Sequence, residues 1–250
     1  MFKIVSKRNL NPTVTMMDIE APLVAKKAEA GQFIILRTDE DGERIPLTVA
    51  GFDREKGTVK IIFQIVGATT EKLNHKNVGD CLADFAGPLG KPTETEGLHK
   101  VCVVGGGVGC AIALPIAEKL HAEGCEVHTI VGFRNKDFVI LEDDFRAAGC
   151  DLRIATDDGS YGHHGLVIDL IQDVHPDKIF ACGPKVMLRA VTEFAKAHNI
   201  PCEISLEERM ACGIGACLGC AVELYDENGE TYMGHVCKDG PVFPAERVVF

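Results

Sequence analysis

Hydrophobic and polar positions follow one pattern up to about residue 97 and another pattern after it. In the first part, the runs 31–38 (GQFIILRT) and 57–67 (GTVKIIFQIVG) are rich in β-branched and aromatic residues and are bounded by glycines and charged turns, which is typical of strands. The charged stretches 39–42 and 53–57 indicate hairpin loops. Several short strands without a long helix predict a small antiparallel β-barrel over residues 1–97.

From residue 98, strand-like and helix-like segments alternate. Apolar runs typical of strands cover 100–107, 126–133, 151–156, 178–184 and 201–206, helical stretches lie at about 108–122, 144–149 and 186–199, and the segment 165–173 continues the alternation. Strands that alternate with helices form βαβ units, whose strands lie parallel in one sheet. The sequence therefore predicts an α/β domain over 98–205, followed by a small Cys- and Gly-rich module over 206–250.

Composition and charge narrow the classes of partner. The 250 residues are 46% hydrophobic, enough for a sizeable core. The formal net charge of −11 repels phosphate backbones, so we expect no nucleic-acid partner. The N-terminus becomes polar within a few residues, unlike a signal peptide, and the longest uncharged run, Val101 to Ala117, falls short of a membrane-spanning helix. We expect a soluble, cytoplasmic protein that does not bind membranes.

Four of the eleven cysteines have the spacing of an iron–sulfur site. Cys212, Cys217 and Cys220 form C-x4-C-x2-C, and Cys237 follows after 16 residues; this is the plant-type [2Fe–2S] arrangement of thiolate ligands. The interleaved glycines allow the backbone to wrap closely around a compact inorganic core. A zinc site with four cysteine ligands is the alternative, but it usually shows two C-x2-C-like knuckles, and only one is present here. Chance spacing among many cysteines is the remaining alternative.

Three glycine-containing loops follow strands of the predicted parallel sheet. The first, GGGVG, holds Gly105, Gly106, Gly107, Val108 and Gly109; it follows a strand and opens a helix, where free N–H groups favour a pyrophosphate. The full G-x-G-x-x-G is absent because position 110 is Cys, and a purely structural turn is the alternative.

The other two loops are TDDGSYG (156–162) and ACGP (181–184), which contains Cys182, Gly183 and Pro184. Ligands of open α/β sheets bind outside the carboxyl ends of the strands, so the three loops form one consistent nucleotide site. Asp157 and Asp158 can accept hydrogen bonds from ribose hydroxyls and would repel a 2′-phosphate, which favours NAD over NADP. A solvated turn is the alternative for this acidic pair.

Two motifs of the first domain offer groups suited to phosphate and hydroxyl recognition. In RIPLT (44–48), Arg44 supplies a guanidinium fork, Pro46 rigidifies the strand and Thr48 supplies a hydroxyl. In VGATT (66–70), a glycine and two threonines precede a short predicted helix. A surface arginine and a helix-capping threonine are the ordinary alternatives.

Taken in order, RIPLT, VGATT, GGGVG and ACGP resemble the motifs of the ferredoxin–NADP⁺ reductase superfamily. SLEERMACGIGACLGC (205–220) with VCKDGPVF (236–243) is similar to the electron-transfer subunit of class 1B dihydroorotate dehydrogenase. The flavin motif departs from that family's usual R-[RK]-P-[FIL]-S. GERIPLT, GPLGKPT, ILEDDF and TDDGSYG resemble instead the small subunit of NADH-dependent ferredoxin:NADP⁺ oxidoreductase, or sulfide dehydrogenase, which has an acidic residue where this chain has Cys212.

The resemblance implies FAD, NAD(H) and a [2Fe–2S] cluster as cofactors. It implies that FAD is held by Arg44, Pro46, Leu47, Thr48, Gln64, Ile65, Val66, Gly67, Thr69 and Thr70. It implies that the dinucleotide is held by Gly105 to Gly109, Asp157, Cys182 and Gly183, and the cluster by the four cysteines. No side chain is expected to act as a catalytic acid or base.

The expected function is electron transfer between NAD(H), FAD and the cluster, to or from a partner flavoprotein subunit in a hetero-oligomer. A dihydroorotate dehydrogenase-type partner, and thus pyrimidine biosynthesis, is favoured, and a bifurcating complex is the alternative. A zinc-stabilised nucleotide-binding redox sensor is the alternative from another class.

Overall fold

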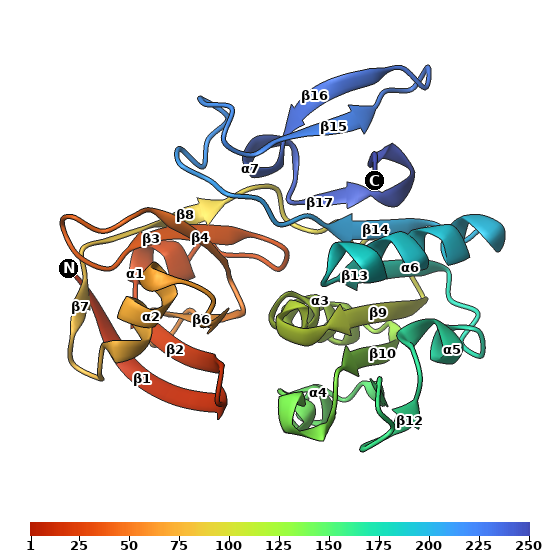
Figure 1. Ribbon diagram of the computed structural model, residues 1–250, viewed down its shortest axis with the longest axis horizontal. Coiled ribbons are helices and arrows are strands. Elements are labelled where there is room, and N and C mark those ends of the chain that lie inside the picture. The colour runs from red at the N-terminus through yellow and green to blue at the C-terminus, as the bar shows by residue number, and fades with distance from the viewer. The chain divides into compact units, whose positions relative to one another are not determined.

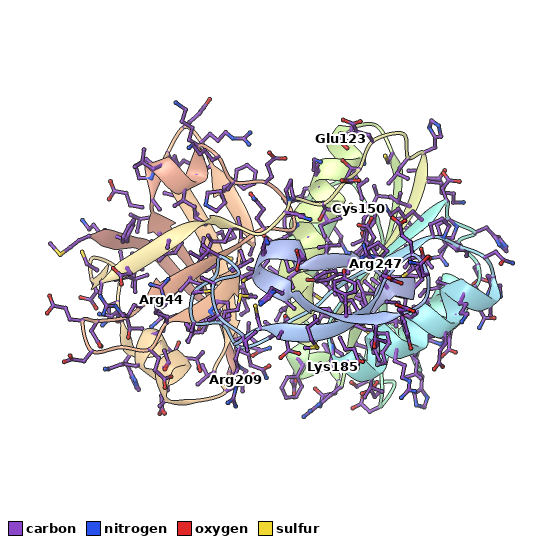
Figure 2. The ribbon with its side chains drawn as sticks, turned by 90° about the horizontal axis from the view of Figure 1, so that it is seen from above. Arg44, Glu123, Cys150, Lys185, Arg209 and Arg247 are labelled. Carbon is purple, nitrogen blue, oxygen red and sulfur yellow. The ribbon has the colours of Figure 1, made fainter.

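The computed structural model describes residues 1–250 and divides into two compact units (Figure 1). Unit 1 comprises residues 1–93, 207–221 and 235–241, and unit 2 comprises 94–206, 222–234 and 242–250. Arg44 and Arg209 belong to unit 1, whereas Lys185 and Arg247 belong to unit 2 (Figure 2). The segment 206–250, for which the sequence predicts one small module, is thus divided between the two units.

Unit 1 is built on two antiparallel sheets, ordered β5-β6-β2-β1-β7 and β4-β3-β8. Its strands are β1 (Phe2–Asn11), β2 (Val14–Glu20), β3 (Phe33–Arg37), β4 (Ile45–Thr48), β5 (Gly51–Asp53), β6 (Thr58–Gln64), β7 (Cys81–Leu82) and β8 (Asp84–Leu89). Its helices are α1 (Pro22–Ala25), α2 (Ala68–His75) and α7 (Val236–Asp239). The predicted hairpin loops at 39–42 and 53–57 join β3 to β4 and β5 to β6, which pair antiparallel.

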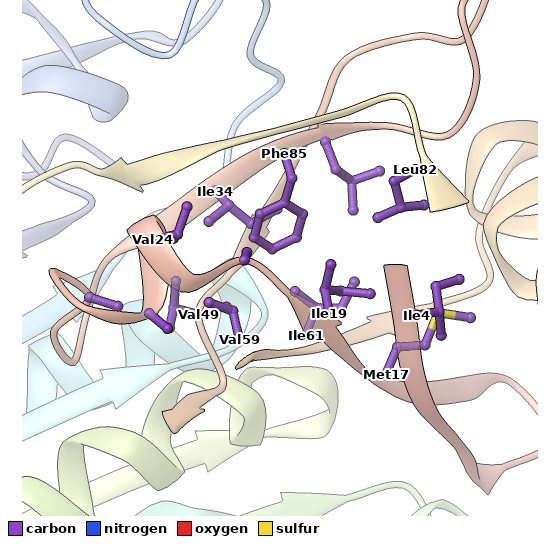
Figure 3. Close-up of a cluster of buried hydrophobic side chains, with 14 of the residues drawn as sticks. Ile4, Met17, Ile19, Val24, Ile34, Val49, Val59, Ile61, Leu82 and Phe85 are labelled. Atoms are coloured by element: carbon purple, nitrogen blue, oxygen red, sulfur yellow. The ribbon is translucent and has the colours of Figure 1, made fainter. Parts of the chain in front are cut away.

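One hydrophobic core lies between the two sheets of unit 1 (Figure 3). Met17 and Ile61 come from the larger sheet, and Ile34 and Phe85 come from the smaller one; all four are buried. Strand residues alternate between faces with a period of two, so each sheet directs one apolar face inward. The other face of β3 is apolar and buried as well, because Phe33 and Ile35 are 4% and 0% exposed.

Unit 2 contains a seven-stranded sheet ordered β12-β11-β10-β9-β13-β14-β17, in which only β17 runs antiparallel to its neighbour. Its strands are β9 (Lys100–Gly106), β10 (Glu126–Phe133), β11 (Asp151–Thr156), β12 (His163–His164), β13 (Lys178–Cys182), β14 (Cys202–Ser205) and β17 (Val242–Pro244). Its helices and 3₁₀ turns are η1 (Gly107–Gly109), α3 (Cys110–Ala122), η2 (Lys136–Phe138), α4 (Glu142–Ala147), α5 (Val167–Ile171), α6 (Lys185–Ala197) and η3 (Ala245–Arg247). A separate hairpin consists of β15 (Ala221–Tyr225) and β16 (Thr231–His235).

Helices cover both faces of the parallel sheet. Helix α3 packs with α4, and α5 packs with α6; Figure 1 shows the two pairs on opposite sides of the sheet. Strands β10 and β11 lie on one side of β9, whereas β13 and β14 lie on its other side. The strand order therefore reverses between β9 and β13. That reversal is a topological switch point, where open α/β sheets bind ligands at the carboxyl ends of the strands. No helix of the chain is long and apolar enough to cross a membrane.

Candidate functional site

The structure brings the four predicted cysteine ligands together in unit 1. The sulfurs of Cys212 and Cys217 lie 3.4 Å apart, and the Cys237 amide donates to the sulfur of Cys220 over 3.5 Å. No three His, Cys, Asp or Glu side chains are placed to hold one metal ion; the thiols instead form two pairs, Cys212 with Cys217 and Cys220 with Cys237. Two pairs of thiolates are the donor set that a cluster of two irons uses, so these residues fit a [2Fe–2S] group.

Backbone N–H groups point at the sulfurs. The amides of Ile214 and Ala216 donate to Cys212 Sγ over 3.4 and 3.3 Å, and the Gly215 amide donates to Cys237 Sγ over 3.1 Å. Gly213 and Gly215 have φ of +74° and +76°, a conformation that favours glycine and that turns these amides inward. Amides of this kind stabilise negative charge on sulfur and tune the potential of a cluster.

The thiols differ in acidity because their surroundings differ. Hydrogen bonds from the Ile214 amide, from Cys217 and from the Ala216 amide lower the pKa of Cys212 to about 6. Burial, together with a hydrogen bond to Cys220, raises the pKa of Cys237 to about 12. The exposed end of the loop therefore favours the thiolate form that binds metal, while the buried end depends on a bound cation to lose its proton.

Strand β4 places the flavin motif next to the cysteine loop. Arg44, Pro46 and Thr48 alternate with Ile45 and Leu47, which pack against the core of unit 1. The exposed Arg44 donates from Nε to the carbonyl oxygen of Ala211 over 2.9 Å. The predicted flavin motif and the predicted cluster loop are thus in direct contact within one unit.

The second predicted flavin motif lies at the N-terminus of α2. The Thr69 hydroxyl donates to Glu43 over 2.8 Å, which connects α2 with the loop before β4. The Thr70 hydroxyl accepts the amides of Val66 and Gly67 over 3.0 and 3.1 Å, so it caps the helix. Gln64 is exposed, Val66 is 77% exposed, and Ile65 packs against the core.

Gly67 has no structural reason to be glycine. Its backbone is extended, with φ of −171°, and a methyl group on it would have no atom within 4 Å. The open space lies at the first turn of α2, where N–H groups have no intrahelical partner and the helix dipole favours an anion. The position has room for an anionic group, and any side chain at Gly67 would occupy that space.

The nucleotide loops of unit 2 meet at the switch point. A methyl group on Gly109 would lie 2.3 Å from the Cys182 carbonyl oxygen, and one on Gly183 would lie 3.0 Å from the backbone of Gly106. These glycines allow GGGVG and ACGP to pack backbone against backbone. Gly107 differs, because its φ is +55° and no atom lies within 4 Å of a methyl group there. Its surroundings leave room for a dinucleotide phosphate beside η1 and α3.

The two aspartates that follow β11, Asp157 and Asp158, have different surroundings. Asp158 accepts the Ser160 amide over 2.9 Å, and its hydrogen bonds with Ser160 hold its pKa below the usual value. Asp157 is exposed at the carboxyl edge of the sheet. Asp158 therefore shapes the turn, and Asp157 is the better candidate for a ribose contact.

Two supporting contacts of this loop are not evident from the sequence. The Tyr161 hydroxyl lies 3.0 Å from both carboxylate oxygens of Glu142 in α4. The Lys136 amide donates to Ser160 Oγ over 2.9 Å, so the loops after β10 and β11 are joined. The only sequence signal was the presence of polar residues after both strands, which does not specify the pairs.

Comparisons with known proteins agree with this site. Residues 207–249 match the family model described as the iron–sulfur cluster binding domain of dihydroorotate dehydrogenase B. A Thermotoga maritima protein described as a homolog of the dihydroorotate dehydrogenase B (NAD⁺) electron transfer subunit is 38% identical, over 98% of this chain and 86% of its own length. The electron transfer subunit of that enzyme from Caldanaerobacter subterraneus subsp. tengcongensis is 38% identical, over 99% of this chain and 97% of its own length.

A solved structure also covers the whole chain. It comes from the NADH-dependent reduced ferredoxin-NADP oxidoreductase, studied for flavin-based electron bifurcation. It is 37% identical, with a TM-score of 0.92, and the match covers 100% of this chain and 90% of that one.

An antiparallel unit carrying four gathered thiols, together with a parallel sheet whose switch point is lined by glycines, defines a nucleotide-linked iron–sulfur oxidoreductase. The chain belongs to the family of dihydroorotate dehydrogenase B electron transfer subunits and their homologues. Membership confirms the predicted resemblance, the predicted fold class, and the prediction of FAD, a [2Fe–2S] cluster and NAD(H) as cofactors. The individual ligand assignments stay predictions.

Proposed function

We propose that this chain is the electron-transfer subunit of a cytoplasmic dihydroorotate dehydrogenase B-type complex, in which it passes electrons between NAD(H) and a catalytic flavoprotein subunit. The observation that carries the proposal is the placement of two thiol pairs in unit 1, with three of the four thiols on the loop that follows Ala211, which Arg44 of the flavin motif contacts directly, and the fourth, Cys237, on α7. One compact unit would then hold both the flavin and the iron–sulfur group, which suits electron transfer between them.

The side chains and backbone of each unit have separate tasks in this function. In unit 1, the open position at Gly67 and the amides of the first turn of α2 receive phosphate, while Arg44 supplies a positive charge. In unit 2, Gly107 leaves space for the pyrophosphate of NAD(H), and Asp157 accepts from its ribose. FAD held at these residues would supply the chemistry of hydride exchange with NAD(H) and of single-electron exchange with the cluster. The protein provides binding, orientation and charge, without a catalytic acid or base.

The cysteine loop presents apolar side chains beside its ligands. Ile214 is 66% exposed and Leu218 is 79% exposed, and both lie between cysteines of the C-x4-C-x2-C motif. Exposed apolar residues next to a redox group suit a partner that must approach closely. We assign this surface to the catalytic subunit that exchanges electrons with the cluster.

Chemical analysis of the protein isolated without oxygen tests the proposal. We expect one FAD, two irons and two acid-labile sulfides per chain, and bleaching of the flavin absorption by NADH. Co-expression with a dihydroorotate dehydrogenase catalytic subunit should give a stable complex that reduces NAD⁺ with dihydroorotate. A colourless protein with one bound zinc per chain would instead support the redox-sensor alternative.

A matched pair of cysteine variants tests the ligand set. Cys217→Ser removes one member of the Cys212 pair and should abolish the iron–sulfur signal in electron paramagnetic resonance while FAD remains bound. Cys81→Ser, on β7 of the same unit, is the control and should retain both groups. A cluster of unchanged signal in Cys217→Ser would refute the assignment of these four ligands.

One observation favours a second candidate, the small subunit of a bifurcating complex. The solved chain from the NADH-dependent reduced ferredoxin-NADP oxidoreductase covers all of this chain at 37% identity. The two candidates differ in the partner subunit, so co-purification from the native host distinguishes them. A dihydroorotate-oxidising flavoprotein supports the first candidate, whereas a large subunit with additional iron–sulfur clusters supports the second.

A further inference from the structure

Arg44 joins two segments that are 167 residues apart in the sequence. Its Nε donates to the carbonyl oxygen of Ala211, the residue immediately before the first cluster ligand, Cys212. Both residues belong to unit 1, and the Arg44 side chain is otherwise exposed (Figure 2). A guanidinium has five N–H donors in a rigid plane, so the bond from Nε leaves the four Nη donors for another acceptor.

The surroundings of Arg44 indicate what the other acceptor is. The adjacent Glu43 accepts the Thr69 hydroxyl over 2.8 Å, and Asp39 pairs with Lys72 over 2.8 Å, so the loop before β4 is fixed to α2 at two points. The same helix begins beside the open position at Gly67. Glu43, the residue next to Arg44, is therefore bonded to the helix whose N-terminus is open to an anion, and the planar fork of Arg44 suits a phosphate.

The bond to Ala211 also acts on the cluster ligand. Cys212 Sγ accepts the amides of Ile214 and Ala216, and these hydrogen bonds depend on where the loop begins. We therefore expect a change at the Ala211 peptide to change the N–H donation to Cys212. Such donation stabilises the more negative, reduced state of an iron–sulfur cluster and so raises its potential.

We propose that Arg44 is a positioning residue that couples the two redox groups of unit 1: Nε holds the cysteine loop while the Nη groups hold a phosphate of FAD. The inference rests on the proposed function, and it adds that flavin binding and the state of the cluster depend on each other through this one side chain. Coupling between two bound groups is reciprocal in free energy. Removal of FAD must therefore change the environment of the cluster, and weakening of the loop contact must weaken FAD binding.

The test uses the full chain with its cluster intact, before and after reversible removal of FAD. In the wild-type protein, we expect removal of FAD to shift the g-values of the reduced cluster and to lower its midpoint potential. Arg44→Lys keeps the positive charge, but its single ammonium nitrogen replaces the planar guanidinium, whose separate nitrogens can donate to two acceptors at once. In this variant we expect the FAD dissociation constant to be at least fivefold larger than in the wild type. With FAD bound, the midpoint potential of the cluster should already be lower, and removal of FAD should not shift the potential or the g-values further.

Arg54→Lys is the matched control. Arg54 is also an exposed arginine of unit 1 that donates to a backbone carbonyl, that of Ala28, over 3.1 Å, and its guanidinium lies over Phe52. This variant should retain the wild-type potential and the wild-type response to FAD removal.

Two results would overturn the inference. One is a wild-type cluster whose g-values and potential do not respond to FAD removal, which can be measured even if Arg44→Lys fails to fold. The other is an Arg44→Lys protein that responds to FAD removal as the wild type does, because the coupling would then run through other residues. A wild-type protein that binds no FAD or no cluster would contradict the proposed function itself, so the two failures are distinguishable.

Discussion

A methyl group on Gly109 would lie 2.3 Å from the carbonyl oxygen of Cys182 and 2.6 Å from its carbonyl carbon. Gly109 ends the 3₁₀ turn η1 that follows β9, and Cys182 ends β13, so the two residues lie on either side of the switch point. Because the contact is to backbone rather than to a flexible side chain, Gly109→Ala must displace one of the two strand ends. We expect a loss of about 1–3 kcal/mol of unfolding free energy, the usual cost of overpacking, measured by urea denaturation.

Gly51→Ala is the control for this substitution. The nearest atoms to a methyl group at Gly51 belong to Lys60, at 3.6 Å and beyond, which is ordinary van der Waals contact. Alanine in a strand is about 0.5–1 kcal/mol more favourable than glycine, so this variant should be neutral or slightly stabilised. Equal stability of the two variants would show that the strand ends at the switch point move freely.

The sequence predicts regular elements of unit 2 well, and it predicts loop contacts poorly. The strands expected at 126–133 and 151–156 are β10 and β11 to the residue, because their apolar runs are bounded by charged residues and glycine. The helix expected from 108 begins at Cys110, because Gly107–Gly109 forms a 3₁₀ turn first. The residue types alone do not distinguish such a turn from the first turn of a helix.

In the candidate site too, the sequence predicts motifs of neighbouring residues but not contacts between segments that are far apart in the chain. The spacing of Cys212, Cys217 and Cys220 is local, so the sequence displays it directly. The bond between Arg44 and Ala211 joins distant segments, and no residue type predicts it. Asp158 looked equivalent to Asp157 in sequence, yet its carboxylate bonds with Ser160 depend on the conformation that the loop adopts.

Gly67 provides a prediction that separates folding from cofactor binding. Gly67→Val adds a side chain where no atom lies within 4 Å, and the extended backbone with φ of −171° suits a β-branched residue. We expect the thermal stability of the FAD-free protein to stay within about 0.5 kcal/mol of the wild type. FAD should bind at least about tenfold more weakly, which corresponds to about 1.4 kcal/mol, in a titration of flavin fluorescence.

A fall in stability of the FAD-free Gly67→Val protein would mean that the glycine serves the fold rather than the ligand. The substitution Gly51→Ala offers a comparison in the same unit. A methyl group there would meet only ordinary contacts at 3.6 Å and beyond, so FAD affinity should be unchanged.

Glu126 provides a prediction about pH. Hydrogen bonds from His128 and Lys100 hold the pKa of the Glu126 carboxyl below its usual value. A carboxyl whose pKa is lower in the folded state stabilises that state above its unfolded pKa, about 4.3, and the contribution is lost as the pH falls through the folded pKa. The difference in urea midpoint between wild type and Glu126→Gln should therefore be present at about pH 6 and decrease as the pH falls below about 4.3.

Glu193→Gln in α6 is the control for this titration. Glu193 is 72% exposed and pairs only with Arg189 over 3.4 Å, and surface pairs of this kind contribute about 0–1 kcal/mol. The urea midpoint of Glu193→Gln should differ little from that of the wild type throughout this pH range. A Glu126→Gln difference that stays constant between pH 6 and pH 3 would contradict the assigned role of the carboxylate.

The acidic pair after β11 predicts how the chain distinguishes NADH from NADPH. Asp157 is exposed and Asp158 is engaged with Ser160, so the repulsion of a 2′-phosphate should come mainly from Asp157. In stopped-flow measurements of flavin reduction, Asp157→Asn should lower the NADH to NADPH rate ratio by about tenfold, the effect of about 1.4 kcal/mol. Asp158→Asn keeps an acceptor for the Ser160 amide and should leave the ratio within about twofold of the wild type. If Asp158→Asn changes the ratio more than Asp157→Asn, the turn residue is the specificity determinant and the assignment made from the Ser160 contacts is wrong.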